Sequence, residues 1–456
     1  MRMLTGCVAV ALALSLTACG DDGAQEAAGG GAGSAGAGGA AGSAGGAGAG
    51  QAGQEPDIPM SRSAAAYDTE PDLSQDDYES FIAETNAFGF DLFHAMADDQ
   101  NTFLSPTSTV VALAMTYAGA KGETATQMAA AMRSTLEPAT SHAAVNQLTL
   151  DLESRNIAPH DTQEGEKSLR ISPVNGVFAQ HDYTFRDSYL DTLSVNYDSG
   201  MFLLDFAQAP AGSRETINRW VAYHTEDRID ELLGEDAIKP TTRLVLANAL
   251  YFYGSWAHAF NEDDTADGTF HTLAGGDVTV PMMQAGLPVP YGQGDGYEIV
   301  ELPYDGNEMA MTIVLPEEGR FQEIASGIDG AWWTSARAQL SAGAGVSLTL
   351  PKFSFTWGTE SFADALTDMG MVDAFMDGAA DFSGMDGTTN LFIQDVVHQA
   401  FVGVDEHGTE AAAATAVIMG FNAAPELEVT VDRPFLFFVT DASGAVVFVG
   451  QVTDPS

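Results

Sequence analysis

The amino-acid sequence predicts a mixed α+β fold, because helical patterns dominate its first half and strand patterns its second. Helical spacing of apolar residues covers residues 79–97, 108–117, 123–132 and a stretch that begins near residue 213. Strand patterns cover residues 243–253, 309–315, 346–355 and 391–404, with two short strands between residues 434 and 449. Few strands alternate with helices, so a doubly wound parallel sheet is not favoured.

The first and fourth predicted helices each have a clear apolar face. The face of the first helix is formed by Phe81, Thr85, Phe88, Leu92 and Met96. The third helix follows Gly122 and ends near Met132. The face of the fourth helix is formed by Ile217, Trp220, Val221, His224 and Ile229.

Composition limits the classes of partner. The chain has 456 residues, of which 45% are apolar, enough for a sizeable core. It carries 17 Lys and Arg against 64 Asp and Glu, a formal net charge of -47. Nucleic acids and anionic membrane surfaces bind clustered cations, so neither is an expected partner. The acidic residues also lack the spacing of a calcium-binding loop.

The amino terminus resembles a targeting segment. Arg2 precedes a short apolar run over residues 7–16, which is too short to span a bilayer as a helix. Leu16, Thr17, Ala18 and Cys19 then resemble the lipobox of bacterial lipoproteins, with an ordinary secretory signal as the alternative. We therefore expect residues 1–18 to be removed and Cys19 to be lipidated. The protein would be exported and held at the cell envelope, surface-exposed or extracellular, and would touch the membrane only through this anchor.

We expect residues 19–77 to form a flexible tether, because residues 29–53 are almost entirely Gly, Ala and Ser. The folded domain is expected over residues 78–456. Cys7 and Cys19 are the two cysteines of the chain. The mature protein would then hold one thiol at most, so no internal disulfide is expected.

The sequence lacks the common catalytic motifs, including GxSxG, HExxH, GxxxxGK[ST] and CxxC. Ser105, Ser108, Asn248 and His398 are candidates for a hydrolase site. All four fall inside apolar helix or strand patterns, where polar groups usually cross-link buried elements. We expect them to be structural, and we expect no enzyme activity, no metal and no cofactor.

Four segments together carry a resemblance to a known family. They are NTFLSPTSTVVALAMTYAGAKGETATQM (residues 101–128), LVLANALYFYGSWAHAF (244–260), HQAFVGVDEHGTEAAAATAV (398–417) and DRPFLFFVTDASGAVVFVGQV (432–452). In content and order they resemble the serpins, the serine protease inhibitors. The resemblance implies a monomer with three β-sheets, about nine helices and an exposed reactive loop near the carboxyl end.

The reactive loop of a serpin is cut by its target protease, after which its first part enters the main sheet as a new strand. The resemblance assigns this loop hinge to Glu406, Gly408, Thr409, Glu410, Ala411, Ala412, Ala413, Ala414 and Thr415. Alternation along a strand would place Thr409, Ala411, Ala413, Thr415, Val417 and Met419 on one face and Glu410 on the other. Small inner residues would enter the sheet without clashes.

Spacing from Gly408 places the scissile bond at Asn422–Ala423, with Phe421–Asn422 as the alternative. Residues 409–432 contain no basic residue, so a trypsin-like target is not expected. A chymotrypsin-, subtilisin- or elastase-like protease fits the loop better.

Further positions follow from the resemblance. Ser105, Ser108, Asn248 and His398 match the shutter, the polar cluster beneath the point where the main sheet opens. Trp256 and Lys352 match the breach, where the inserting strand enters, and Lys352 is expected to pair with Glu406. His407 stands where serpins often carry a charged residue, and we assign it no role.

Two functions remain open at this stage. The first is a suicide inhibitor of serine proteases, with cysteine proteases as the alternative target class. The second is a non-inhibitory binding or carrier module, since a fold does not fix a function. The small hinge residues favour inhibition.

Overall fold

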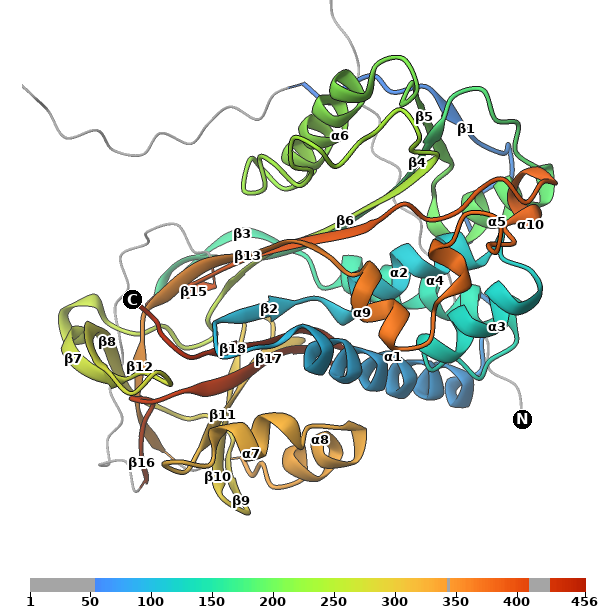
Figure 1. Cartoon of the computed structure of the whole chain (residues 1–456). Helices are drawn as coiled ribbons and strands as arrows, with labels where there is room; N and C mark the ends of the chain where they lie inside the picture. Colours follow the sequence, from blue (N-terminus) through green and yellow to red (C-terminus); the bar gives the residue numbers. More distant parts are fainter. Residues whose placement is uncertain (1–53, 343–344, 410–426) are drawn as a thin grey trace, which may run out of the picture. The chain divides into compact units, whose positions relative to one another are not determined.

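The computed structural model describes residues 54–342, 345–409 and 427–456. The main sheet formed by these residues has eight strands (Figure 1). Its strand order is β1-β5-β4-β6-β15-β14-β13, with β3 paired to β4. The strands are β1 (Met60–Ser61), β3 (Ile157–Thr162), β4 (Gly165–Gln180), β5 (Met201–Leu204), β6 (Leu244–Ser255), β13 (Phe353–Ser361), β14 (Val396–Val404) and β15 (Gly408–Thr409). Nearly every residue of β6 is buried, as expected for a central strand that is covered on both faces.

A six-stranded sheet lies beneath the first sheet, in the order β2-β18-β17-β11-β10-β9. Its strands are β2 (Thr102–Leu104), β9 (Tyr291–Gly294), β10 (Tyr297–Pro303), β11 (Met309–Pro316), β17 (Phe435–Asp441) and β18 (Val446–Val452). The Phe103 ring stacks on Phe448 at 4.6 Å and on Phe437 at 5.5 Å, which fills the core with aromatic side chains.

A four-stranded sheet, in the order β16-β12-β8-β7, completes the fold. Its strands are β7 (Ala266–His271), β8 (Asp277–Leu287), β12 (Val346–Pro351) and β16 (Leu427–Thr430). Three sheets with mixed helices confirm the predicted fold class.

Ten α-helices and two short 3-10 helices cover these sheets in the described residues. They are α1 (Gln75–Met96), α2 (Pro106–Tyr117), α3 (Gly122–Ala131), α4 (Pro138–Ser154), α5 (Asp187–Tyr197), α6 (Pro210–His224), α7 (Phe321–Ser326), α8 (Gly330–Arg337), α9 (Ala363–Asp368), α10 (Ser383–Asp386), η1 (Glu262–Asp264) and η2 (Asp373–Phe375). Helix α6 covers the outer face of the eight-stranded sheet, and α2 lies on its inner side (Figure 1). None of these helices is both long and apolar enough to cross a bilayer.

The predicted strand over residues 391–404 begins only at Val396, as β14, and Ile229, assigned to the fourth predicted helix, lies beyond the end of α6 at His224. Two further boundaries differ from the sequence prediction for identifiable reasons. Helix α1 begins four residues before the predicted start, at Gln75, because the Ser74 hydroxyl accepts a hydrogen bond from the Asp77 N–H and caps it. The predicted strand over residues 346–355 is two strands, β12 and β13, in different sheets. The chain changes sheet at Lys352, where the apolar alternation also changes phase, from Val346, Leu348 and Leu350 to Phe353 and Phe355. The sequence prediction overlooked this change of phase and joined the two strands into one.

The N-terminal segment, residues 54–74, was expected to belong to the tether, and the structure corrects this boundary. Strand β1 pairs antiparallel with β5, and the Asp68 N–H donates to the Val195 carbonyl over 2.9 Å. Arg62 forms an ion pair with Asp198 at the end of α5. Ile58 packs in the apolar cluster under α6. The segment is too short and polar for a periodic signal, so its contacts could not be read from composition.

Replacing Ile58 with Asp tests whether the N-terminal segment stabilises the domain. The Ile58 side chain is 9% exposed and packs in one cluster with Phe178, Phe202 and Trp220. A carboxylate there would be buried without a partner, so we expect a loss of about 3 kcal/mol. Thermal unfolding at a fixed scan rate measures the change, with Ile58→Val as the control. Equal unfolding temperatures for the Asp and Val variants would contradict this packing.

Candidate functional site

The root of the predicted reactive loop forms a closed hairpin in the structure. Strand β14 ends at Val404, residues 405–407 turn, and β15 (Gly408–Thr409) returns antiparallel with Thr409 opposite Val404. The Asp405 N–H donates to the Gly408 carbonyl over 3.0 Å and closes this hinge turn. The Asp405 carboxylate accepts the His407 N–H at 2.8 Å and the Gly408 N–H at 3.2 Å. Two residues of the hinge thus already belong to the sheet.

Strand β15 lies between β6 and β14 only at one end of the sheet. There, Thr409 pairs with Gly254 of β6 as well as with Val404 of β14. Farther along, β6 and β14 pair directly and in parallel over Leu246–Ala249 and Val396–Gln399. The described sheet is therefore open to a further strand at one end and closed at the other. Residues 410–426, with the predicted hinge positions Glu410 to Thr415 and both candidate scissile bonds (Phe421 to Ala423), lie outside the described residues.

The structure brings together the four predicted shutter residues. His398 of β14 lies directly opposite Asn248 of β6, with His398 Nδ1 and Asn248 Oδ1 2.6 Å apart. Asn248 Nδ2 donates to the Ser108 hydroxyl at 2.6 Å. The Ser105 hydroxyl caps α2 by accepting the Ser108 N–H at 3.1 Å. The cluster joins the two central strands to the start of α2, at the point where the sheet is closed.

Hydrogen bonds fix the tautomer of His398. The Ser105 N–H donates to His398 Nε2 at 3.3 Å, so the proton of the neutral ring is on Nδ1, facing the Asn248 carbonyl oxygen. Burial lowers the pKa of His398 to about 3. A second proton on Nε2 would face a donor and would be buried, so the cluster requires a neutral ring. This geometry suits a structural cross-link, with no nucleophile–base pair.

A second buried cluster lies at the open end of the sheet, around Trp256. The Trp256 ring stacks on Tyr304 at 4.7 Å, and its indole N–H donates to the Asp405 carbonyl at 3.0 Å. The Tyr304 hydroxyl lies 2.7 Å from the Thr409 hydroxyl. Tyr304 was not predicted from the sequence. It directly follows β10 and is brought to this cluster by an antiparallel bridge to Trp256, in which the Ala257 N–H donates to the Pro303 carbonyl and the Asp305 N–H donates to the Ser255 carbonyl.

Lys352 and Glu406 form the predicted ion pair, with Lys352 Nζ 2.6 Å from Glu406 Oε2. The Glu406 side chain is 4% exposed and that of Lys352 is 38% exposed. Burial would raise the pKa of Glu406, but hydrogen bonds from Lys352 and Thr265 outweigh it and hold that pKa below its usual value. The Thr265 hydroxyl donates to Glu406 Oε1 over 2.7 Å. The hinge turn is thus fastened to the junction of β12 and β13, at Lys352, and to Thr265, the residue before β7.

His407, which sequence reasoning left without a role, also fastens the hinge turn. Its ring is nearly buried, and His407 Nε2 lies 2.8 Å from Glu262 of η1. Its carbonyl accepts the Trp256 N–H at 2.8 Å, and the Glu406 carbonyl accepts the Phe260 N–H at 2.8 Å. Side chains and backbone therefore both hold the hinge turn against the segment that follows β6.

Comparisons with known proteins agree with this architecture. The family model described as "Serpin (serine protease inhibitor)" matches residues 83–455. The chain belongs to the serpin family. An uncharacterized serpin-like protein of Thermococcus kodakarensis is 35% identical over 84% of this chain and 88% of its own length. Human leukocyte elastase inhibitor is 32% identical over 83% of this chain and 100% of its own length.

A solved serpin structure extends the similarity. The native state of tengpin, a thermophilic serpin, superimposes with a TM-score of 0.75 and 25% sequence identity. The match covers 86% of this chain and 97% of tengpin. The described structure, with its main sheet open at one end, therefore resembles a serpin in its native state.

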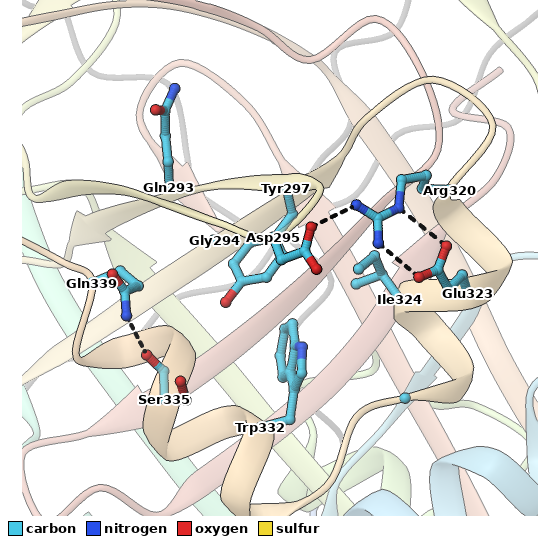
Figure 2. Close-up of a pocket in the computed structure, with 11 residues that line it drawn as sticks. Gln293, Gly294, Asp295, Tyr297, Arg320, Glu323, Ile324, Trp332, Ser335 and Gln339 are labelled. Atoms are coloured by element: carbon cyan, nitrogen blue, oxygen red, sulfur yellow. Dashed lines mark hydrogen bonds and ion pairs between the residues drawn. The ribbon is translucent and has the colours of Figure 1, made fainter.

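A separate cleft lies between the β9–β10 hairpin and helices α7 and α8 (Figure 2). Its volume is about 650 Å³, and the tilted rings of Tyr297 and Trp332 lie in it, 5.2 Å apart. Arg320 pairs with Asp295 at 3.1 Å and with Glu323 at 2.7 Å, so its charge is compensated within the cleft. None of the lining residues belongs to β6, β14 or β15, which separates this cleft from the hinge. No group of three potential metal ligands occurs within residues 54–342, 345–409 and 427–456.

Acid should destabilise the native protein through two buried histidines. Burial lowers the pKa of His398 to about 3 and that of His142 to about 4, from an ordinary value of 6.5. Below pH 6.5 the unfolded chain binds protons that these folded rings do not, so stability is complete above pH 6.5 and falls as the pH drops below it. Each ring contributes a slope of up to about 1.4 kcal/mol per pH unit.

Thermal unfolding between pH 8 and pH 5 at constant ionic strength measures this slope. His398→Gln and His142→Gln should each flatten the dependence. If wild type and both variants share the same slope, burial of these rings does not control acid stability.

Proposed function

We propose that the protein is a suicide-type inhibitor of serine proteases, with cysteine proteases as the alternative target class. The observation that carries this proposal is the position of Thr409, which lies in the sheet between β6 and β14 and is 3% exposed. The hinge that follows is built from small residues, Ala411 to Ala414. The relatives of this chain include leukocyte elastase inhibitors, which supports protease inhibition in general.

The register of β15 indicates the path of an inserting strand. If the loop continues antiparallel to β6 and β14, Ala411 and Ala413 fall between apolar residues of the two strands. Thr415 then reaches the level of Asn248 and His398. Each new backbone hydrogen bond contributes about 1 kcal/mol net, so some ten residues rival the ~5–15 kcal/mol that stabilises a typical domain. The uncut protein would then be held in a higher-energy state by a kinetic barrier.

Trapping follows from a competition between insertion and hydrolysis. The nucleophile of the protease attacks the carbonyl carbon of the residue before the scissile bond, and the peptide bond breaks to leave an acyl-enzyme and a new amine on the next residue. Insertion would carry the acyl-enzyme along the sheet before water attacks the ester. Distortion of the protease active site would then prevent its release.

The loop sequence indicates the target class. We place the scissile bond at Asn422–Ala423, with Phe421–Asn422 as the alternative, and residues 409–432 hold no basic side chain. A chymotrypsin-, subtilisin- or elastase-like protease is therefore the proposed target. The names of the elastase-inhibitor relatives agree with an uncharged residue at the cleavage site.

A panel of proteases tests the inhibitor proposal. Wild-type protein should form a complex with at least one non-trypsin-like protease that survives SDS. Thr409→Arg should abolish the complex while cleavage continues, because an unpaired charge would be buried where Thr409 now lies, at a cost of several kcal/mol. Thr409→Ser, which keeps the hydroxyl, is the matched control. Trapping by the Arg variant at wild-type stoichiometry would refute insertion in this register.

Nicking the loop between residues 417 and 423 tests metastability without knowledge of the target. Insertion adds a central strand, so the nicked protein should unfold at a markedly higher temperature than the intact one, with both fragments still associated. A cut in an ordinary surface loop only loosens a protein. Mass spectrometry locates the cut, and calorimetry compares the two forms. A nicked form that melts at or below the intact form would favour a non-inhibitory binding or carrier module.

The amino terminus supports a proposal about location. We propose that Cys19 is lipidated and anchors the protein to the bacterial cell envelope, on the basis of the Leu16–Cys19 motif. Cys19 lies outside the described residues. Cys19→Ser should move the protein from the detergent phase to the aqueous phase in a partitioning assay. Unchanged detergent-phase partitioning of the variant would contradict the anchor.

A further inference from the structure

We propose that Tyr304 is a positioning residue: its hydroxyl captures that of Thr409, so that the hinge is docked in the sheet, in a fixed register, before any protease cuts the loop. This inference rests on the proposed inhibitory function. It adds to that function the side chain that holds the first inserted residue and the starting point of insertion.

The pairing of the two hydroxyls is enclosed. Tyr304 is 0% exposed and Thr409 is 3% exposed, and their oxygens are 2.7 Å apart. Either oxygen can donate to the other. If Thr409 left the sheet, the Tyr304 hydroxyl would lose this partner while its ring stayed in the core. An unpaired buried hydroxyl is unfavourable, so the docked hinge is preferred.

The Tyr304 ring is held in place by its neighbours rather than by Thr409. It stacks on Trp256 with an interplanar angle of 12°, and Phe252 meets it edge-on at 5.0 Å. Gly254 makes room for the ring, since a Cβ there would lie 2.8 Å from Tyr304 Cδ1. Because the ring is fixed, the position of its hydroxyl defines where Thr409 must stop.

The backbone beside Thr409 is fitted to the same position. A Cβ on Gly408 would lie 2.0 Å from the Gly254 carbonyl oxygen, so the docked hinge admits only glycine there. Gly408 and Thr409 pair with Ser255 and Gly254 of β6. A loop that slipped by two residues would set a side chain against Gly254 and an alanine methyl against the Tyr304 hydroxyl. The contact therefore selects the register as well as the docked state.

A double-mutant cycle tests the pairing. Tyr304→Phe and Thr409→Val each leave one buried hydroxyl without its partner, whereas the double variant leaves none. We expect each single variant to raise the number of loops cleaved per trapped protease about fivefold to tenfold. The double variant should return to within about twofold of the wild type, and Thr409→Ser should behave like the wild type. Tyr189→Phe, which removes another buried hydroxyl far from the hinge, is the control and should leave the ratio unchanged.

Hydrogen exchange on the uncut protein reports on docking without any protease. The amides of Gly408 and Thr409 should be protected in the wild type and in Tyr189→Phe, and should exchange at least tenfold faster in Tyr304→Phe. Gly408→Ala should have the same effect, through the backbone contact. Additive effects in the cycle, or equal protection in wild type and Tyr304→Phe, would overturn the assignment to Tyr304. Protection that depends on Tyr304 in a protein that traps no protease would instead overturn the inhibitor proposal and leave the docked hinge standing.

Discussion

The direct pairing of β6 with β14 is the contact on which the rest of this structure depends. It closes the main sheet at the level of Asn248 and His398, whereas Thr409 keeps the two strands apart at the other end. The closed end is held by polar side chains within an apolar core, and a buried polar bond is costly to leave unmade. The cluster therefore resists separation of the two strands, and under the proposed mechanism an inserted strand would have to supply replacement bonds.

Fastening of the hinge turn complements this closure. Glu406 is held by Lys352 and Thr265, and His407 is held by Glu262, so three elements converge on one turn. The charged partners retain contact with solvent, which limits the contribution of each pair. The number of attachments, more than the strength of any one, fixes the position of the hinge turn.

Much of this arrangement could be predicted from the sequence, and the exceptions have physical causes. The central strands could be predicted because they are long apolar runs. The Lys352–Glu406 pair could be predicted from the resemblance to the serpins. Tyr304 was missed because its role depends on a bridge and a ring contact with Trp256, a residue distant in sequence, and no local pattern encodes such a pairing. The N-terminal segment was missed because its contacts are backbone pairing and single side chains such as Ile58, without periodicity. Contacts between elements that are distant in the sequence are thus what could not be predicted.

Strands β6 and β14 keep one constant register along the main sheet. Asn248 lies opposite His398 where the strands touch, and Gly254 and Val404 flank the same residue where they are separated. The offset between β6 and β14 is the same in both places. If the sheet opened further with this offset unchanged, one half would move sideways relative to the other without sliding along the strand axis. Side chains on both halves would then keep their faces and their neighbours along each half, so the core would widen without being rebuilt.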